Sequence, residues 1–421
     1  MIEPTSPLQI VAFRRLWLSR FASVVATNGM VVILGYQLYD IARSAYGMSV
    51  ARASFQLGLL GLAQFVPLFV LTPAAGVIAD RYDRRLIGAA AVGLDAGVAL
   101  TLAVVTHAGG LTLPLLFGLA ALHGVARVFV GPAISSIAPN VVPAVLMPRA
   151  IGLTSMAMQI GMISGPALAG LLFARSASAP YWIAAVLLAI ACGALLLLPR
   201  LPLHSGNRGA HPLRQIADGF RYVRDERFLL GCITLDLFAV ILAGATALLP
   251  VYARDILHVG AEGLGQMRAA PAVGAAIVGV WLSFRPFTHN VGVKMLAGVA
   301  VYGAATIAFG VSHTYPLSLA LLAVLGAADM VSVFIRSSLV QLNTPDTMRG
   351  RVSSISGLAI SASNELGEME SGMLASLLGA PGAVVFGGVG AIVVTLVWAR
   401  LFPELPHTRT FAAHYRQEEP A

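Results

Sequence analysis

The stretch Gly76-Val77-Ile78-Ala79-Asp80-Arg81-Tyr82-Asp83-Arg84-Arg85 separates two long apolar segments. Five of its last six residues carry a charge, whereas the residues on both sides are almost all hydrophobic. Such a cluster of charges cannot lie in hydrocarbon, because the cost of burying each unpaired charge in a bilayer is high. The stretch therefore predicts a tight turn in water between two membrane-spanning helices.

The composition agrees with a membrane protein throughout the chain. Hydrophobic residues make up 57% of the 421 residues, charged residues make up 11%, and the mean hydropathy is +0.82. A soluble domain carries about 25% charged residues. A membrane-spanning helix needs about 20 mainly apolar residues, and the sequence predicts twelve such spans. They lie near residues 13–40, 53–79, 86–106, 111–138, 149–174, 180–198, 228–255, 263–284, 293–311, 315–341, 351–379 and 381–402.

The basic residues report topology and do not indicate a nucleic-acid partner. If the N-terminus is cytoplasmic, twenty of the 27 Lys and Arg residues fall on the cytoplasmic side and five on the outer side. Arg127 and Arg336 fall within spans. This asymmetry is the positive-inside bias of short loops. It predicts that both termini are cytoplasmic, and it accounts for the net charge of +8 without nucleic acid.

The sequence offers no enzyme signature. It has no phosphate-binding Gly-x-x-x-x-Gly-Lys-Ser/Thr loop, no His-Glu-x-x-His and no Gly-x-Ser-x-Gly. Cys192 and Cys232 both lie in predicted spans, which argues against a disulfide framework. We therefore expect no catalytic residues, no metal and no bound cofactor, and we expect a bacterial inner (plasma) membrane as the location.

The chain divides into two related halves. Residues 1–198 form a predicted N-terminal bundle, 199–227 a cytoplasmic linker, 228–402 a C-terminal bundle and 403–421 a cytoplasmic tail. A shift of about 202 residues relates the halves, since it brings Gly165 onto Gly367. In the linker, apolar residues repeat at helical spacing and predict an amphipathic helix on the membrane surface; they are Leu213, Ile216, Phe220 and Val223.

Several motifs identify a family resemblance. The spacing Gly76-x-x-x-Asp80-Arg81-x-x-Arg84-Arg85 resembles the signature loop of the major facilitator superfamily of transporters. Gly161-x-x-x-Gly165-Pro166-x-x-x-Gly170 resembles the glycine-proline motif of its drug and metabolite exporters, and Arg127 with Gly131 resembles its intramembrane arginine motif. Three further stretches are similar to the enterobactin-exporter branch: Phe13–Phe21, Thr344–Arg351 and Ser363–Glu368.

The resemblance implies a fold and a function. The expected fold is an all-α membrane protein of two pseudo-symmetric six-helix bundles. The expected function is proton-driven export of a small, siderophore-like metabolite by alternating access, with the proton gradient as the energy source. A multidrug efflux pump, or a lysolipid flippase or importer of the same fold, remains an alternative. The expected partners are a small-molecule substrate, protons and the lipid bilayer, and the expected oligomeric state is a monomer.

The resemblance also implies a gating role for the charged loop. Asp80 would contact the start of the eleventh span, at Arg349 or Arg351, and hold the cytoplasmic side closed. Alternatively, the loop only anchors the topology. Asp83 stands where the family pattern commonly has a glycine, a position where Asp tolerates an unusual backbone conformation.

Eight ionisable residues are predicted to lie inside spans. They are Asp95, Arg127, Asp236, Asp329, Arg336, Glu365, Glu368 and Glu370. Each would cost about 2.5–3.5 kcal/mol at the bilayer centre, so they must pair, face water or be neutral. Arg127 and Asp329 occupy equivalent positions in the two halves and could pair across a cavity. Alternatively, Asp329 and Arg336 belong to a local arrangement of paired charges in the tenth span.

Glu365 and Glu368 are the leading candidates for proton carriers. Their three-residue spacing places both on one helix face, and two neighbouring carboxylates do not readily ionise together. Asp236 is the second candidate, and a structural hydrogen-bonding role is the alternative for all three. His123 either relays protons or packs as a hydrogen-bonded core histidine. Asp95 lies in Gly93-x-x-x-Gly97 and requires a partner that the sequence does not name.

Overall fold

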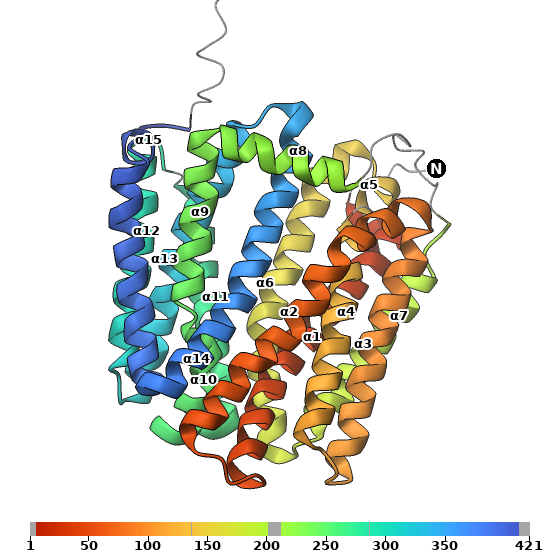
Figure 1. Cartoon of the computed structure of the whole chain (residues 1–421). Coiled ribbons are helices and arrows are strands. Elements are labelled where there is room, and N and C mark those ends of the chain that lie inside the picture. The colour runs from red at the N-terminus through yellow and green to blue at the C-terminus, as the bar shows by residue number, and fades with distance from the viewer. Residues whose placement is uncertain (1–5, 136, 201–211, 286, 412–421) are drawn as a thin grey trace, which may run out of the picture. The chain divides into compact units, whose positions relative to one another are not determined.

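The computed structural model describes residues 6–411 except 136, 201–211 and 286, and every regular element in these ranges is a helix (Figure 1). Eleven of the described helices are long and apolar enough to cross a membrane. The eleventh, α14 (Asp346–Leu401), contains two of the predicted spans, because the chain leaves helical geometry at Gly379. Gly379 adopts φ 74°, which favours glycine. The all-helical class is confirmed, and the predicted spans 351–379 and 381–402 are the two parts of α14.

Two compact units divide the chain. Unit 1 comprises Met1–Gly47, Leu62–Gly209 and His258–Ala269, and unit 2 comprises Met48–Gly61, Ala210–Leu257 and Ala270–Ala421. Two helices pass from one unit to the other, and they are α2 (Val50–Arg81) and α11 (Gly260–Phe284). The units are therefore not identical to the sequence halves, since each takes in part of a helix from the other half.

Unit 1 is built on α1 (Val11–Ser44), which packs against α6 (Met147–Arg175) and α7 (Ala179–Leu196). A second layer consists of α3 (Arg84–His107), which packs against α7 and α4 (Leu113–Ser135). Short elements complete the connection between α4 and α6; they are α5 (Ala138–Val141) and η2 (Ala144–Leu146), and η1 (Pro7–Gln9) precedes α1.

Unit 2 contains α9 (Arg227–Leu242), α12 (Val291–Gly310) and α13 (Tyr315–Leu342) beside α14 (Figure 1). Helix α12 packs against both α13 and α14, and α14 packs against α9. Beyond α9 the chain continues through η3 (Ala245–Leu248), α10 (Leu249–Val251) and a π-helical turn, η4 (Tyr252–Ile256). The short α15 (Glu404–His407) contacts α9 and α12.

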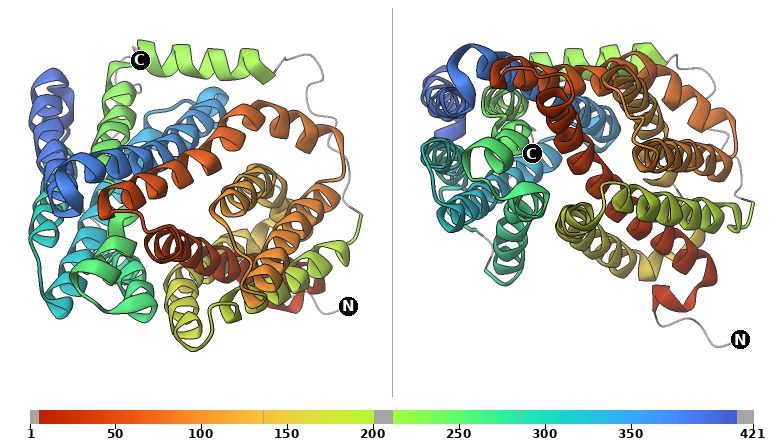
Figure 2. Two further views of the ribbon diagram at one scale, coloured as in Figure 1. Left: turned by 60° about the horizontal axis from the view of Figure 1, so that its bottom comes forward. Right: turned by 90° about the horizontal axis from the view of Figure 1, so that it is seen from below.

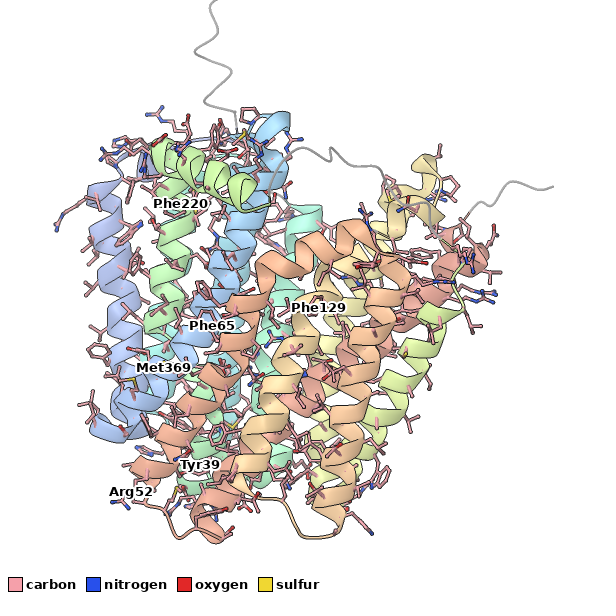
Figure 3. The ribbon with its side chains drawn as sticks, turned by 45° about the vertical axis from the view of Figure 1, so that its right-hand side comes forward. Tyr39, Arg52, Phe65, Phe129, Phe220 and Met369 are labelled. Atoms are coloured by element: carbon pink, nitrogen blue, oxygen red, sulfur yellow. The ribbon has the colours of Figure 1, made fainter. Side chains whose placement is uncertain are left out.

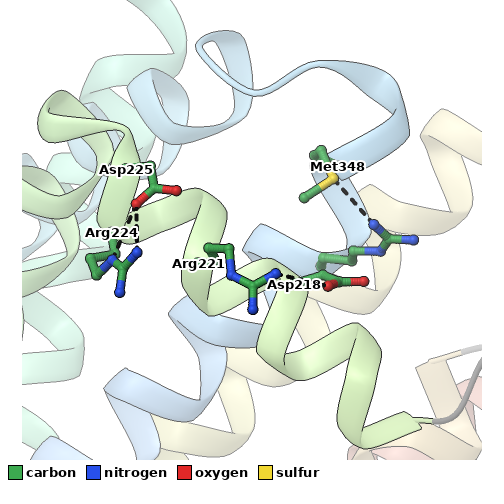
Figure 4. Close-up of polar contacts among 6 residues, drawn as sticks. Asp218, Arg221, Arg224, Asp225 and Met348 are labelled. Carbon is green, nitrogen blue, oxygen red and sulfur yellow. Dashed lines mark hydrogen bonds and ion pairs between the residues drawn. The ribbon is translucent and has the colours of Figure 1, made fainter.

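The linker forms a helix, α8 (Pro212–Asp225), which lies at the margin of unit 2 and packs against α14 (Figure 2). Val223 is buried in the core of this unit, whereas Phe220 is 62% exposed (Figure 3). Arg224 pairs with Asp225, and Arg221 lies 4.0 Å from Asp218 (Figure 4). The side chains of Leu213 and Ile216 lie outside the described residues. Within the predicted apolar stripe, Val223 therefore packs against the protein, whereas Phe220 does not.

Glycines allow the backbones of unit 2 to approach closely. Gly372 on α14 faces Gly58 in the first part of α2, and a Cβ at Gly372 would lie 2.5 Å from the Cα of Gly58. No real Cβ atom fits at that distance from backbone, so any larger residue must push the helices apart. Small residues at such positions are the usual basis of close helix packing in membranes.

Replacing Gly372 with leucine is expected to destabilise the protein, because overpacking a helix contact costs about 1–3 kcal/mol. The matched control is Gly357→Leu on the same helix, where a Cβ meets no atom within 4 Å. Thermal denaturation of the purified variants measures the difference. Equal midpoints of thermal denaturation for the two variants would show that α2 and α14 do not approach each other this closely at Gly372.

Candidate functional site

A buried ion pair joins two helices of unit 2. Nη1 of Arg336 on α13 donates to Oδ1 of Asp236 on α9 at 2.5 Å. Asp236 is 8% exposed and Arg336 is 5% exposed, so the two charges are almost completely removed from solvent. The sequence placed both residues inside spans but did not pair them with each other. The structure makes Asp236 the partner of Arg336 and gives Asp236 a role in holding α9 to α13.

Two further polar groups surround the ion pair. Asp329, two turns before Arg336 on α13, interacts electrostatically with both Asp236 and Arg336. Tyr302 on α12 interacts with Asp329 and Asp236 and donates its hydroxyl hydrogen to the carbonyl oxygen of Ala243 at 3.0 Å. Three helices therefore contribute to one polar cluster, which we call the C-terminal charge cluster: Asp236, Tyr302, Asp329 and Arg336.

The seventh predicted span is interrupted beside this cluster. The sequence predicted one span over 228–255, but regular α-helix ends at Leu242, and Ala243 and Gly244 have non-helical backbones. A Cβ at Gly244 would lie 2.6 Å from the carbonyl oxygen of Gly367 on α14. At the interruption, the carbonyl oxygen of Ala243 accepts hydrogen bonds from the backbone N–H of Ala245 and from the hydroxyl of Tyr302. Interrupted helices of this kind form substrate and ion sites in many transporters; Gly244 was the available sequence signal.

The two candidate proton carriers lie on α14 against the first part of α2. A Cβ at Gly61 would lie 2.9 Å from Cβ of Glu368, 3.2 Å from its Oε2 and 3.3 Å from the carbonyl oxygen of Glu365. Glu365 is 6% exposed, and both glutamates make polar or electrostatic contacts. Glu370 is half-buried, and its Oε2 has no hydrogen-bond partner among the described residues. The structure brings Glu365 and Glu368 to one helix contact and leaves their proton-carrying role a prediction.

The glycine-proline motif lies on α6 and forms its contacts within unit 1. A Cβ at Gly161 would lie 2.6 Å from Cγ1 of Val24, and one at Gly165 would lie 2.6 Å from the carbonyl oxygen of Val25, both on α1. Gly170 faces α11, where a Cβ added at this glycine would collide with the carbonyl oxygen of Ala261. Pro166 lies inside the helix. The motif thus places two neighbouring helices in backbone contact with α6.

The gating loop is described only in part. The predictions for Gly76, Asp80 and Arg81 concern side chains that lie outside the described residues. Asp83 has an ordinary extended backbone with φ −60°, and as the N-cap of α3 it accepts a hydrogen bond from the backbone N–H of Arg85 at 3.0 Å. Arg85 also donates to the carbonyl oxygen of Leu198 at 2.7 Å. Arg85 therefore joins the start of α3 to the end of α7.

The remaining basic residues of the predicted gate and cavity lie on separate elements. Arg349 is exposed at the start of α14, and Arg351 donates to the sulfur of Met348 at 3.4 Å (Figure 4). Arg84 begins α3, and Arg127 lies on an exposed side of α4. The contacts proposed for Asp80 with Arg349 or Arg351, and for Arg127 with Asp329, join residues of the two units and stay predictions.

A second buried pair was not predicted from the sequence. Nδ1 of His123 on α4 lies 2.6 Å from Oδ1 of Asp95 on α3. His123 is fully buried and Asp95 is 4% exposed. The sequence identified both residues as unusual in a span, but their 28-residue separation gave no signal that they meet. In the part of the chain that the structure describes, no group of three or more His, Cys, Asp or Glu side chains could hold a metal ion.

Comparison with known proteins assigns the family. The model of the transmembrane secretion effector family matches residues 2–420. The chain belongs to this family of the major facilitator superfamily. The enterobactin exporter EntS of Citrobacter koseri is 27% identical over 406 residues, which cover 94% of this chain and 93% of the relative. EntS of Escherichia coli (strain K12) is 26% identical over 404 residues, with the same coverage.

Solved structures show the same fold at low sequence identity. A D323A mutant of the nucleoside transporter NupG has a TM-score of 0.72 at 14% identity and covers 93% of this chain and 100% of its own. A bacterial homolog of the human lysosomal transporter Spinster, in an inward-facing and unoccupied conformation, has a TM-score of 0.70 at 16% identity and covers 96% and 98%. Membership of the transmembrane secretion effector family makes this chain a multi-pass membrane transporter and not an enzyme.

Removing one partner of the buried pair is expected to destabilise this transporter strongly. Arg336→Met leaves Asp236 without its ion-pair partner, and Asp236→Asn leaves Arg336 only its electrostatic interaction with Asp329. Breaking a buried pair typically costs about 3–5 kcal/mol. The double variant removes both charges and is expected to recover most of that loss. Thermal denaturation of the purified variants measures all three.

The control is Asp225→Asn, which breaks the exposed pair with Arg224 on α8. Such a surface change is expected to alter the free energy of unfolding by no more than about 0.5 kcal/mol. If the double variant is no more stable than the worse single variant, the two side chains are not partners in the protein.

Proposed function

We propose that this transporter is a proton-coupled exporter of a small metabolite of the siderophore class. It works by alternating access in the bacterial inner membrane, as a monomer with both termini in the cytoplasm. The match of the whole chain to enterobactin exporters carries the proposal on substrate class and direction. The asymmetry of basic residues, twenty against five, supports the orientation.

Carboxylates inside the membrane support the proposal that the coupling ion is the proton. Asp, Glu and His side chains within spans are rare, and in pumps and transporters they form proton relays. This chain places Asp236 and Asp329 in the C-terminal charge cluster, and Glu365 and Glu368 at the contact of α14 with α2. A carboxylate that binds one proton loses its charge, so proton uptake changes the electrostatic cost of each arrangement of these helices.

The interrupted seventh span supports a transport cycle. Gly244 lies against Gly367, in the same turn of α14 as Glu368. Movement of α14 would therefore change both the contact of Glu368 with α2 and the packing of the helix interruption. We expect these contacts to couple protonation of Glu368 to a rearrangement of the span beside Asp236. That linkage is what a proton-coupled carrier needs, because binding energy must bias one conformation over another.

Inverted membrane vesicles with an acidic interior are expected to accumulate labelled enterobactin through this transporter. Protons leaving the vesicle drive the metabolite inward, which corresponds to export in the cell. Collapsing the pH gradient with nigericin is expected to abolish the accumulation, and vesicles without the transporter are the control. Gradient-driven uptake of ethidium alone would assign multidrug efflux instead. Accumulation of enterobactin that is insensitive to nigericin would contradict proton coupling.

Glu368→Gln and Glu365→Gln are each expected to reduce gradient-driven accumulation at least tenfold without changing expression, because an amide cannot bind and release the coupling proton. The matched control is Glu262→Gln at the exposed start of α11, which is expected to transport as the unmodified protein does. Initial rates in inverted vesicles, normalised to the amount of protein, measure the effect. Unchanged rates in both variants would remove these two glutamates from the coupling mechanism.

A further inference from the structure

The His123–Asp95 pair lies in the interior of unit 1. Oδ1 of Asp95 is 2.6 Å from Nδ1 of His123, and Oδ2 of Asp95 accepts a hydrogen bond from the hydroxyl of Thr27 on α1 at 3.4 Å. Three helices, α1, α3 and α4, therefore meet at one carboxylate. Both oxygens of Asp95 have donors, which holds the carboxylate in place and fixes the ring of His123 beside it.

The other ring nitrogen of His123, Nε2, takes no part in the contact with Asp95. Nε2 is completely buried and has no hydrogen-bond partner among the described residues. Oε1 of Gln64, on the second part of α2, is also buried and without a partner in the described part of the chain. Helices α4 and α2 pack closely next to these two groups, because a Cβ at Gly124 on α4 would lie 2.6 Å from the carbonyl oxygen of Gln64 on α2. Unsatisfied buried polar atoms are rare and costly, so this pair of atoms calls for a functional reason.

We propose that Asp95 and His123 form a proton-binding site in unit 1, with Nε2 of His123 as the atom that takes up and releases the proton. In the proton-free state Nδ1–H of the neutral ring donates to the Asp95 carboxylate, and the pair carries a net charge of −1. Adding one proton to Nε2 gives an imidazolium and a net charge of 0. Loss of the same proton to water restores the first state, and no other bond changes. This site deepens the proposed function, on whose proton coupling it rests.

Few other ionisable groups can compete for the proton. On α4, Arg127 lies one helical turn after His123, and on α1, Arg20 lies two turns before Thr27. From α7, Cys192 donates to the carbonyl oxygen of Ala89, and Tyr181 donates to Oε1 of Gln37. Between Arg52 and Asp80, α2 contains no ionisable residue.

Arg127 and Arg20 stay protonated at every physiological pH. The side chains that can gain or lose a proton near neutral pH at this site are therefore those of the pair itself. Imidazole is the side chain whose unperturbed titration falls between pH 5 and 8, which suits a carrier that works between a neutral cytoplasm and a more acidic exterior.

Histidine-ring NMR on the purified, full-length transporter tests the site directly. A variant in which the other eight histidines are replaced by glutamine keeps His123 as its single ring; each of those eight that the structure describes is exposed. The expected result is a ring signal that shifts between pH 5 and 8 while remaining protected from a soluble paramagnetic agent. Asp95→Asn in this background is expected to move the midpoint of that shift. A protected signal that stays constant from pH 5 to 8 would overturn the proposal.

Transport assays separate this site from the proposed function. In proteoliposomes, His123→Gln is expected to lose gradient-driven accumulation of enterobactin at least tenfold while enterobactin exchange without a gradient stays within twofold. His107→Gln, at the exposed end of α3, is the matched control and is expected to change neither. Full gradient-driven accumulation in His123→Gln would overturn the site alone. A titrating His123 in a protein that shows no proton-driven transport would keep the site and overturn the proposed function.

Discussion

The pairing of charges inside apolar helices is the constraint on which this structure depends. A charge taken out of water costs several kcal/mol, and only a well-placed partner offsets that cost. Unit 2 meets the requirement with the ion pair of Arg336 and Asp236, and in unit 1 the ring of His123 gives the buried Asp95 a hydrogen-bond partner. The first pair joins α9 to α13 across 100 residues of sequence, and the second joins the consecutive helices α3 and α4. The buried polar residues therefore determine which faces of α9 and α13 contact each other, and which faces of α3 and α4 do.

Glycine provides the second constraint, because it decides how closely the backbones approach. At Gly165 and Gly372 there is no space for a side chain, and at Gly244 the same close approach coincides with the end of regular α-helix. The carbonyl of Ala243 accepts a hydrogen bond from Tyr302 as well as from the backbone N–H of Ala245, and Tyr302 also interacts with Asp236. Packing and polar pairing thus meet in unit 2: the span is interrupted where Gly244 approaches α14, and Tyr302 of the C-terminal charge cluster donates to the neighbouring carbonyl.

Much of the fold follows from the sequence, since runs of about 20 apolar residues are a strong and local signal. The twelve predicted spans agree with eleven described helices, one of them bent at Gly379. The interruption at Gly244 escaped prediction because hydropathy averages over the break. Partnerships escaped for a different reason. A buried Asp in a span predicts that a partner exists, but the partner of Asp95 lies 28 residues away and that of Asp236 lies 100 residues away. The rotation and packing of both helices decide which side chains pair, and the sequence of one segment alone does not predict either.

The two buried pairs differ in what a proton can do to them. The guanidinium of Arg336 keeps its charge at every physiological pH, so its pair with Asp236 retains one positive group whatever the proton concentration. An imidazole can be neutral or charged in the same range. The Asp95–His123 pair can therefore exist with a net charge of −1 or of 0 without breaking its own hydrogen bond. A carrier coupled to protons needs both properties: a contact that survives the whole cycle and a contact whose charge changes once in each cycle. The proposed site at His123 adds a contact whose charge changes in unit 1 to the candidate proton carriers Glu365 and Glu368 in unit 2.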